Sequence, residues 1–587
     1  MLISNGKLFA IGLTLSCGFA AQGMSLAVTT SMDSPVPVGT MIAFSAAVAD
    51  APGSNQCYRF RVRRNGGAYR MVRDYGPAST LHWTASDREG AYEMEISARD
   101  LDTGDESTTT SLFHFQSLVT SGEPVITPTS NSLVFLYSAP ACPTGSRIRV
   151  QFRPAGGAHQ NTHYKSCTAG SSMNFYLAGL RANTTYSAQH LVDDGFAITP
   201  GANLTFTTGD LPPNLYSSTV IVPSAKPNTD PILLGGTLGY NPVASDLSGN
   251  VLWYGPWGFT FLTRVEAGGE FWGIVEKPGQ DPSQQIVQKF DLLGMTLLET
   301  NAARVNEQLT NLGKRNITGF HHEARTLPDG NIAVLAGVEQ VLSDVQGPGP
   351  VDVLGDMIVV MDQDLNVVWT WDTFDNLDVH RSAILREKCP AAGCPPFYLA
   401  ATANDWTHGN ALQGTADGDI LYSARNQDWL IKISYQNAAG DGHIVWRMGI
   451  DGDFQINSDD PFPWFSHQHD PNFQAANPQR LMLFDNGNTR VASMQGNSRG
   501  LVLMVDEQNR VVTPVLSADL GVYSAAVGSV QRLRDGNYQF DAGLVQENNT
   551  LDAYSIETNP RGEIQYKVRQ STVLYRVFRM TDLYTPN

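Results

Sequence analysis

The chain has 587 residues and a formal net charge of −18, and 42% of its residues are hydrophobic while only 16% are charged. This length exceeds what one hydrophobic core usually supports, so we expect several domains, and the apolar content excludes a largely disordered chain. The negative charge disfavours nucleic acid as a partner, because its phosphates would be repelled. An anionic substrate meets the same field unless a local pocket reverses its sign.

Residues 1–23 have the features of a signal peptide. LFAIGLTLSCGFAA at residues 8–21 is apolar, follows Lys7 and leads into small residues, and it is too short to span a membrane. No later stretch reaches the ~18 unbroken apolar residues of a spanning helix. Cys17 lies in LSCG, but the preceding Thr-Leu-Ser matches a lipid-modified cysteine poorly. We therefore expect a periplasmic or secreted protein without a membrane span, and we do not favour a lipid anchor at Cys17.

Export would allow the other cysteines to form disulfides, because these bonds persist in an oxidising compartment. Cys389 and Cys394 enclose a Pro-Ala-Ala-Gly turn that a disulfide could close, and Cys142 with Cys167 could link neighbouring strands. Cys57 is then left over, and we expect it to be a buried free thiol. None of the spacings matches a zinc site.

Two small β modules are predicted after the signal peptide. Residues 24–120 contain short alternating runs such as FRVRR and YEMEISARD, separated by turn residues, which predict an immunoglobulin-like β-sandwich. Residues 121–211 form a second module, whose segment around Tyr186 and exit strand LTFTTGD resemble a fibronectin type III domain. Neither module carries evident chemistry, so we expect both to space, dock or stabilise the rest of the chain.

Residues 212–587 contain an internal repeat. A strand is followed by a second strand of the form Asp-x-x-Gly/Asn-x-apolar-x-Trp/apolar, as in MDQDLNVVWTW and AAGDGHIVWRM. Six such units with loops of unequal length are typical of a six-bladed β-propeller, whereas a β-helix would need shorter and more even periods. The predicted fold class is therefore all-β, with a six-bladed propeller after two small sandwiches. The equivalent apolar positions of the repeat are Val251, Met295, Val367, Ile444, Val511 and Ile564.

Three histidine motifs occupy equivalent places of this repeat, each just before a strand. They are GFHHE at residues 319–323, DWTHGN at 405–410 and SHQHD at 466–470. Sites in propellers gather where the inner strands meet at the central channel, and packing rarely demands an imidazole at the same point of three repeats. We therefore expect a functional site there. The histidines of the three motifs are His321, His322, His408, His467 and His469.

Two kinds of chemistry fit these histidines. One is a metal centre completed by Glu323 or Asp470, as in a metal-dependent lyase or hydrolase. The other is metal-free group transfer, with one histidine as nucleophile and others as proton donors or anion binders. A third possibility is a secreted ligand-binding propeller without catalysis, which would have an aromatic pocket rather than convergent His and Arg.

Two arginines favour group transfer. Arg425 lies in LYSARNQ and Arg490 in FDNGNTR, and an arginine beside a metal adds charge to charge, whereas beside sulfate or phosphate it neutralises the anion. We accordingly expect no metal and no cofactor. The alternative for Arg425 is a structural salt bridge with Asp419 or Asp428.

Together the motifs resemble those of the bacterial arylsulfate sulfotransferases, exported enzymes that move a sulfuryl group from one phenol to another. GFHHEARTLPDGN, DWTHGNAL, LYSARNQDWLIKI, FSHQHDPN and FDNGNTR carry the resemblance, which covers roughly residues 213–587. It implies a PAPS-independent aryl-sulfate sulfotransferase that works by a ping-pong mechanism through a sulfohistidine. Its partners would be a phenolic sulfate donor and a phenol acceptor. The sequence leaves the physiological donor, the acceptor and the oligomeric state open.

The resemblance also implies a role for individual residues. It places the nucleophile on His469, with His467 as the alternative. Arg425 matches an arginine that grips the sulfuryl oxygens, and His408 matches an active-site histidine. His322 or His408, as an imidazolium, would protonate the leaving phenolate.

The remaining active-site histidine of the family is matched by either His321 or His322. We favour His322, because the His-Glu pair there parallels His469-Asp470. The predicted catalytic residues are thus His469, His408, His322 and Arg425. The predicted substrate-binding residues are His321, Asn410 and Arg490.

Overall fold

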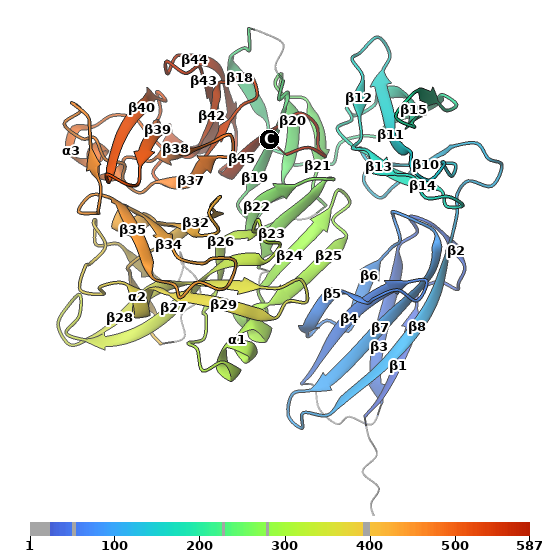
Figure 1. Ribbon diagram of the computed structural model, residues 1–587, viewed down its shortest axis with the longest axis horizontal. Helices are drawn as coiled ribbons and strands as arrows, with labels where there is room; N and C mark the ends of the chain where they lie inside the picture. The colour runs from blue at the N-terminus through green and yellow to red at the C-terminus, as the bar shows by residue number, and fades with distance from the viewer. Residues whose placement is uncertain are drawn as a thin grey trace, which may run out of the picture.

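The computed structural model describes residues 24–49, 55–225, 229–256, 258–276, 281–390 and 399–586. Strands dominate these residues, so the chain is all-β as predicted (Figure 1). Among the described residues the α-helices are α1 (Ala302–Asn311), α2 (Thr373–Asn376) and α3 (Asn488–Met494), and no helix is long and apolar enough to cross a membrane. The predicted signal peptide and Cys17 lie outside the described residues.

The first group of strands forms two sheets that share one core. One sheet has the order β1-β3-β6, and the other contains β2-β8-β7-β4-β5. Phe44, Phe60, Trp83 and Ile96 pack between them, because alternate side chains of a strand point to the same face. The strands are β1 (Ser25–Thr30), β2 (Val36–Pro37), β3 (Ile42–Ala49), β4 (Gln56–Arg64), β5 (Arg70–Gly76), β6 (Thr80–Trp83), β7 (Gly90–Asp100) and β8 (Glu106–Gln116).

The second group also forms two sheets around a core of its own. One has the order β14-β10-β9, and in the other β11 and β15 pair centrally with β12, β13, β16 and β17. Tyr137, Phe152 and Tyr186 lie in the core between them. The strands are β9 (Val125–Pro128), β10 (Phe135–Ala139), β11 (Arg147–Pro154), β12 (Gln160–Asn161), β13 (Lys165–Ser166), β14 (Met173–Leu177), β15 (Thr185–Asp193), β16 (Ile198–Pro200) and β17 (Leu204–Thr207).

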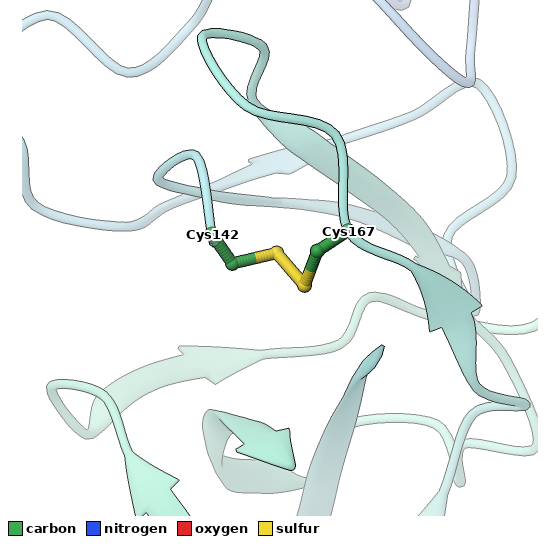
Figure 2. Close-up of a disulfide and its surroundings, with 2 residues drawn as sticks. All are labelled: Cys142 and Cys167. Atoms are coloured by element: carbon green, nitrogen blue, oxygen red, sulfur yellow. A yellow bond between two sulfur atoms is a disulfide. The ribbon is translucent and has the colours of Figure 1, made fainter. Parts of the chain in front are cut away.

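The cysteines of the described residues agree with the expectations from sequence. Cys142 and Cys167 form a disulfide with an S–S distance of 2.09 Å (Figure 2). Cys57 is a buried free thiol. Cys389 is disulfide-bonded, and Cys394, with which it was expected to pair, lies outside the described residues.

The rest of the described chain forms six sheets, each built on four antiparallel strands in consecutive order. One sheet departs from this order and joins the two ends of this part of the chain. In it, β45 (Leu574–Met580) from the end of the chain pairs with β19 (Ile232–Thr237). That sheet continues with β20 (Val243–Asp246) and β21 (Val251–Tyr254). The strands at one edge of the six sheets are called the first-edge strands: β22 (Phe261–Glu266), β26 (Gly319–Thr326), β32 (Gly409–Gly414), β37 (His469–Gln474), β41 (Ser529–Arg532) and β45. They contact one another in a closed order, β22–β26–β32–β37–β41–β45–β22.

The other five sheets each begin at one of these first-edge strands. The second sheet contains β22 (Phe261–Glu266), β23 (Glu270–Val275), β24 (Ile286–Asp291) and β25 (Thr296–Asn301). The third contains β26 (Gly319–Thr326), β27 (Ile332–Ser343), β28 (Pro350–Met361) and β29 (Val367–Asp372), and β30 (Lys388–Pro390) and β31 (Thr402–Asp405) join the same sheet. The fourth contains β32 (Gly409–Gly414), β33 (Ile420–Ala424), β34 (Trp429–Ile433) and β35 (Ile444–Gly449). The last two contain β37 (His469–Gln474), β38 (Asn477–Asp485), β39 (Arg499–Asp506) and β40 (Val511–Asp519), with β36 (Gln455–Ile456), then β41 (Ser529–Arg532), β42 (Tyr538–Glu547), β43 (Thr550–Thr558) and β44 (Ile564–Gln570), with β18 (Ser218–Val222).

The repeat seen in the sequence corresponds to one turn and one strand of every sheet. The six apolar positions of the repeat begin the fourth strand or directly precede it, as Val367 does in β29 and Met295 before β25. The aspartate of the repeat holds the preceding turn, since Asp362 accepts hydrogen bonds from the backbone N–H groups of Asp364 and Asn366. Such an Asx turn explains why Asp recurs at this position.

The first group of strands docks against the second of the six sheets. Arg73 of β5 is paired with Glu299 of β25, both along the backbone and by a salt bridge of 2.5 Å. Arg99 donates to both oxygens of Glu307 in α1 at 2.7 Å. In Figure 1 the strands β4 and β5 accordingly face β25 and α1. These contacts fit a docking role for the first module.

Candidate active site

The structure gathers the three histidine motifs at one end of three neighbouring first-edge strands, β26, β32 and β37. The ring centroids of His322 and His408 are 5.0 Å apart, and those of His321 and His322 are 5.1 Å apart. His469 lies close enough for the charge of His408 to lower its pKa. Four of the five motif histidines therefore form one cluster.

The backbone has an irregularity at the same point of all three strands. The pairing register shifts between Phe320 and Ala324, between Gly409 and Ala411, and after His469. His322 and His408 have φ angles of 57° and 49°, in the left-handed region that non-glycine residues rarely adopt. Bulges of this kind re-aim side chains and are frequent beside active sites.

His469 is held in one tautomer by Asn486. Its Nδ1 lies 2.6 Å from Asn486 Oδ1, and the Asn486 amide donates to the carbonyls of Ser524 and Val527 at 2.8 and 3.0 Å. The amide nitrogen is thus occupied, so Oδ1 must accept the proton of Nδ1. The lone pair of His469 then lies on Nε2. Burial, followed by the charge of Arg425, lowers the pKa of His469 well below its usual value, which keeps the ring neutral and nucleophilic.

A carboxylate in place of the Asn486 amide is expected to protonate His469 more easily. In Asn486→Asp, the opposite charge beside the ring raises its pKa, so protonation of the ring moves to higher pH. An NMR titration of the His469 ring measures this shift. Asn477→Asp, on the strand β38 that Asn486 directly follows, is the matched control and should leave the titration of His469 in place. An unchanged titration in Asn486→Asp would contradict the contact between Asn486 and His469.

His467 is placed differently from His469, although both lie in the same motif. Its Nε2 contacts Glu387 Oε1, and its Nδ1 lies 3.0 Å from Asp428 Oδ1. Burial alone would lower the pKa of His467, but these two carboxylates raise it above its usual value. Both nitrogens are therefore occupied by anions, and the ring offers no lone pair for attack.

His408 is backed by a carboxylate. Its Nδ1 lies 2.6 Å from Asp405 Oδ2, and its side chain keeps 26% of its surface exposed. The carboxylate binds Nδ1, orients the ring and places a negative charge beside it.

His322 is backed by a chain of two groups. Asp356 Oδ1 lies 3.0 Å from His321 Nε2, and His321 Nδ1 lies 2.9 Å from His322 Nδ1. Burial would raise the pKa of Asp356, but His321 and the hydroxyls of Thr407 and Tyr422 lower it. Asp356 is therefore an anion, to which His321 donates from Nε2, and His322 can donate its Nδ1 proton to His321. Burial, then the charges of His408 and His321, lower the pKa of His322 well below its usual value.

Arg425 is a buried cation with few partners. It begins the short 3-10 helix η2 (Arg425–Gln427) and donates to Asn426 Oδ1 at 2.6 Å and to the Ala525 carbonyl at 3.3 Å. Its nearest carboxylate oxygen is that of Glu387 at 3.9 Å, rather than Asp419 or Asp428. Burial lowers the pKa of Arg425. An incompletely paired guanidinium beside His469 can receive the oxygens of an anion.

The remaining two predicted residues have structural partners. Asn410 is fully buried and donates to the Gln468 carbonyl at 2.7 Å, next to His469. Arg490 donates to the Asn497 carbonyl at 2.6 Å and lies 3.7 Å from Asp485. Among the described residues Arg490 has no contact with the histidine cluster, so the structure does not bring it to the site.

Several residues of the site were not selected from the sequence. Tyr575 donates to the His322 carbonyl at 2.7 Å, and Phe261 stacks on the His322 ring at 4.9 Å. Tyr575 lies on β45 and Phe261 on β22, two of the three first-edge strands that carry no histidine motif. The sequence signal that could have found Tyr575 and Phe261 is their place on a first-edge strand of the repeat. Asn486 and Asp405 lie inside two motifs named above, FDNGNTR and DWTHGN.

The carboxylates that follow His322 and His469 do not face the histidines. Glu323 accepts two hydrogen bonds from Arg264, at 2.9 and 2.8 Å, and lies 3.0 Å from Arg576. Asp470 accepts from Arg264 at 2.7 Å. Within the described ranges no three or more His, Cys, Asp or Glu side chains are arranged to hold a metal ion. Arg264 and Arg576 bind the carboxylates that a metal centre on these histidines would need as ligands.

The fold and the cluster define a β protein with a histidine and arginine site suited to group transfer on an anion. The sequence model of the Arylsulfotransferase (ASST) family matches residues 226–576. The chain belongs to the arylsulfotransferase family, which supports arylsulfotransferase activity in general and small-molecule aryl substrates.

Other comparisons add little to this assignment. No curated protein matches the chain. Among solved structures, the chain is similar to the chicken CNTN1 FN1-FN3 domains at 13% sequence identity, covering 32% of this chain and 68% of that one, with a TM-score of 0.13. A TM-score this low does not establish a shared fold.

Proposed function

We propose that the chain is an aryl-sulfate sulfotransferase in which His469 carries the sulfuryl group between a phenolic donor and a phenolic acceptor. The observation that carries the proposal is the contact of His469 with Asn486, which leaves a lone pair on Nε2 of a neutral ring beside Arg425. A neutral, buried histidine with this tautomer, beside an incompletely paired cation, is suited to nucleophilic attack on an anionic ester.

We further propose that residues 212–587 form a six-bladed propeller with this site at its axis. The six sheets, the closed order of contacts between the first-edge strands, and the pairing of β45 with β19 support it. The division into modules at 24–120 and 121–211 is part of the same proposal, supported by their separate cores. Export is supported by the sequence of residues 1–23 and by the Cys142–Cys167 disulfide, since such bonds persist in oxidising compartments.

The first half-reaction transfers the sulfuryl group to the enzyme. His469 Nε2 attacks the sulfur of the aryl sulfate, so that an N–S bond forms while the bond from sulfur to the phenolic oxygen breaks. The Arg425 guanidinium stabilises the negative charge on the three remaining sulfuryl oxygens. The departing electron pair stays on the phenolic oxygen, which needs a proton.

His408 is the better placed of the two predicted acids. Asp405 balances the charge of a His408 imidazolium, and the partly exposed ring can exchange protons with solvent. The lowered pKa of His322 disfavours an imidazolium in the resting enzyme. We therefore assign the proton of the leaving phenol to His408, which contributes typically ~10²–10⁴-fold to the rate.

The second half-reaction returns the sulfuryl group to an acceptor phenol. The phenol gives its proton to His408, which became neutral in the first half-reaction, and its oxygen attacks the sulfur, so that the S–N bond breaks and His469 recovers its lone pair. His408 thereby returns to the protonated form in which the cycle began. His322, whose ring centroid lies 5.0 Å from that of His408, is backed by His321 and Asp356 and can orient the acceptor hydroxyl. Phe261, which stacks on His322 and is only partly buried, offers an aromatic face to a phenol ring.

The pH dependence follows from the neutral histidines. A ring with a lowered pKa becomes protonated, and loses its nucleophilicity, only as the pH falls through that lowered value. The acid limb of kcat/KM is therefore expected well below pH 6.5, the usual value for His469 and His322. A profile measured with p-nitrophenyl sulfate from low to neutral pH checks it. An acid limb at or above 6.5 would contradict the proposal.

The experiment that tests the function is p-nitrophenyl sulfate turnover with and without added phenol. A transferase releases nitrophenol in proportion to the phenyl sulfate formed and depends on the acceptor. A sulfatase releases nitrophenol and inorganic sulfate without acceptor, and a binding protein does neither. Either of the last two results would overturn the proposal.

A further inference from the structure

A cavity lies at the end of the first-edge strands opposite to the histidine cluster. It has a volume of about 540 Å³ and is lined by residues from the ends of these strands, among them Arg325 of β26, Gln474 of β37 and Arg532 of β41. His322 and His469 stand earlier on β26 and β37. Since a strand rises about 3.3 Å per residue, the cavity is on the order of 10–15 Å from the cluster.

A layer of ion pairs separates this cavity from the histidines. Arg264 binds both Glu323 and Asp470, and Arg576 binds Glu323. Glu323 and Arg576 are 0% and 1% exposed. Arg264 and Asp470 also line the cavity. The cavity is thus a separate compartment, closed off from the proposed site by side chains that already have partners.

Arg325 lines the cavity without a carboxylate partner. Its Nη1 donates a hydrogen bond to the Leu412 carbonyl at 2.5 Å, and its buried Nε has no hydrogen-bond partner among the described residues. Burial, followed by the charge of Arg264, lowers the pKa of Arg325 to about 10. Glu323 and Asp470 lie near enough to act on the charge of Arg325, but both carboxylates are bound by Arg264. Arg325 therefore keeps N–H donors that can bind a further anion.

The rest of the lining is also suited to an anion. Gln474 contributes a side-chain N–H group with no acceptor among the described residues. Asp470, whose oxygens accept from Arg264 and from the Val530 N–H, is the single carboxylate among the lining residues. The arginines of the lining are Arg264, Arg325, Arg532 and Arg534. The local charge is therefore positive in a chain whose net charge is −18.

We propose that this cavity is a second anion site, which binds a sulfate-type oxyanion at Arg325. The planar guanidinium presents paired N–H donors that match two oxygens of a tetrahedral anion. The Gln474 amide can donate to a third oxygen. Phe473 and Phe578 form apolar parts of the wall, so the oxyanion can be free sulfate or the head group of an organic sulfate or sulfonate.

The test is the binding of radiolabelled sulfate in equilibrium dialysis, at constant ionic strength set with chloride. It uses the full chain carrying Arg425→Met, which removes the anion-binding cation beside His469. One saturable site per chain is expected. Adding Arg325→Met should weaken that site about 10- to 100-fold, as expected for loss of charge-assisted hydrogen bonds. Adding Arg510→Met should not, since Arg510 also donates to a single backbone carbonyl, that of Val445, but lies elsewhere.

Equal sulfate affinity with and without Arg325→Met would overturn the proposal, as would the absence of a saturable site. Far-ultraviolet circular dichroism checks that the variants are folded, and a crystal of the unsubstituted chain soaked with selenate should give an anomalous peak beside Arg325. No peak at saturating selenate would also overturn it. Competition by toluenesulfonate, which cannot donate a sulfuryl group, identifies an organic anion as a ligand, and lack of competition identifies free sulfate. All these readouts are independent of transferase activity.

Discussion

Replacing His469 by alanine is expected to lower kcat/KM for transfer from p-nitrophenyl sulfate to phenol by about 10⁴-fold or more, as loss of a covalent nucleophile does in other enzymes. The ring contributes the only atom that bonds to the sulfuryl group in the proposed reaction. It is 2% exposed and makes its side-chain hydrogen bonds to Asn486 and the His467 carbonyl, so folding should survive. Initial rates at several donor concentrations measure the effect.

His443→Ala is the matched control for this substitution. His443 is exposed and bonded to Asp441 in a turn, and its loss should leave the rate within about twofold, as is usual for surface changes. If His469→Ala kept a rate within tenfold of the unsubstituted enzyme, the nucleophile would have to be another group.

Replacing Arg425 by methionine is expected to lower kcat by about 10²–10³-fold, the usual effect of removing a group that stabilises transition-state charge. The guanidinium has its closest carboxylate oxygen at 3.9 Å, so much of its charge is available to the sulfuryl oxygens. Arg425 also helps to lower the pKa of His469. The acid limb of the pH profile should therefore move to higher pH in the same variant.

Arg490→Met gives the comparison for Arg425. The motif FDNGNTR predicted a substrate-binding role for Arg490, but its contacts are Asn497 and Asp485. We expect Arg490→Met to change kcat far less than Arg425→Met does. Equal losses in both variants would mean that Arg490 reaches the substrate and that the resting geometry is misleading.

The repeat made much of the fold predictable. Its aspartates hold turns by local hydrogen bonds, and its apolar positions begin outer strands, so both leave a periodic trace in the sequence. The two equivalent histidines, His322 and His408, were found for the same reason. Turns held by local hydrogen bonds and the alternation of side chains along a strand depend on neighbouring residues, so a short stretch of sequence predicts them.

The parts of the site that depend on distant residues could not be predicted. Asn486 contacts His469 from the position just after the neighbouring strand β38, and Asp356 reaches His321 from β28. The difference between His467 and His469 depends on Glu387 and Asp428, which lie far from both in sequence. Likewise, the sequence pattern grouped Glu323 with His322 and Asp470 with His469. In the structure, both carboxylates bind Arg264 instead of a histidine.

The acidic composition of the chain does not oppose an anionic substrate at this site. Arg425 is 9% exposed and its charge acts on His469, while its nearest carboxylate oxygen is 3.9 Å away. Charges inside a low-dielectric site act more strongly than the distant surface charges that make up the net value. In the proposed reaction, the field of Arg425, rather than the net charge of −18, therefore governs the affinity for a sulfate ester.

The most direct test of the covalent mechanism is mass spectrometry of the enzyme quenched after mixing with an aryl sulfate in the absence of acceptor. At alkaline pH, where a sulfuryl group on a histidine nitrogen is best preserved, the peptide that contains His469 should carry one added SO₃. The adduct should disappear when phenol is added and should be absent from His469→Ala. An unmodified His469 peptide in an enzyme that turns over, or an SO₃ group on His408 or His322, would contradict it.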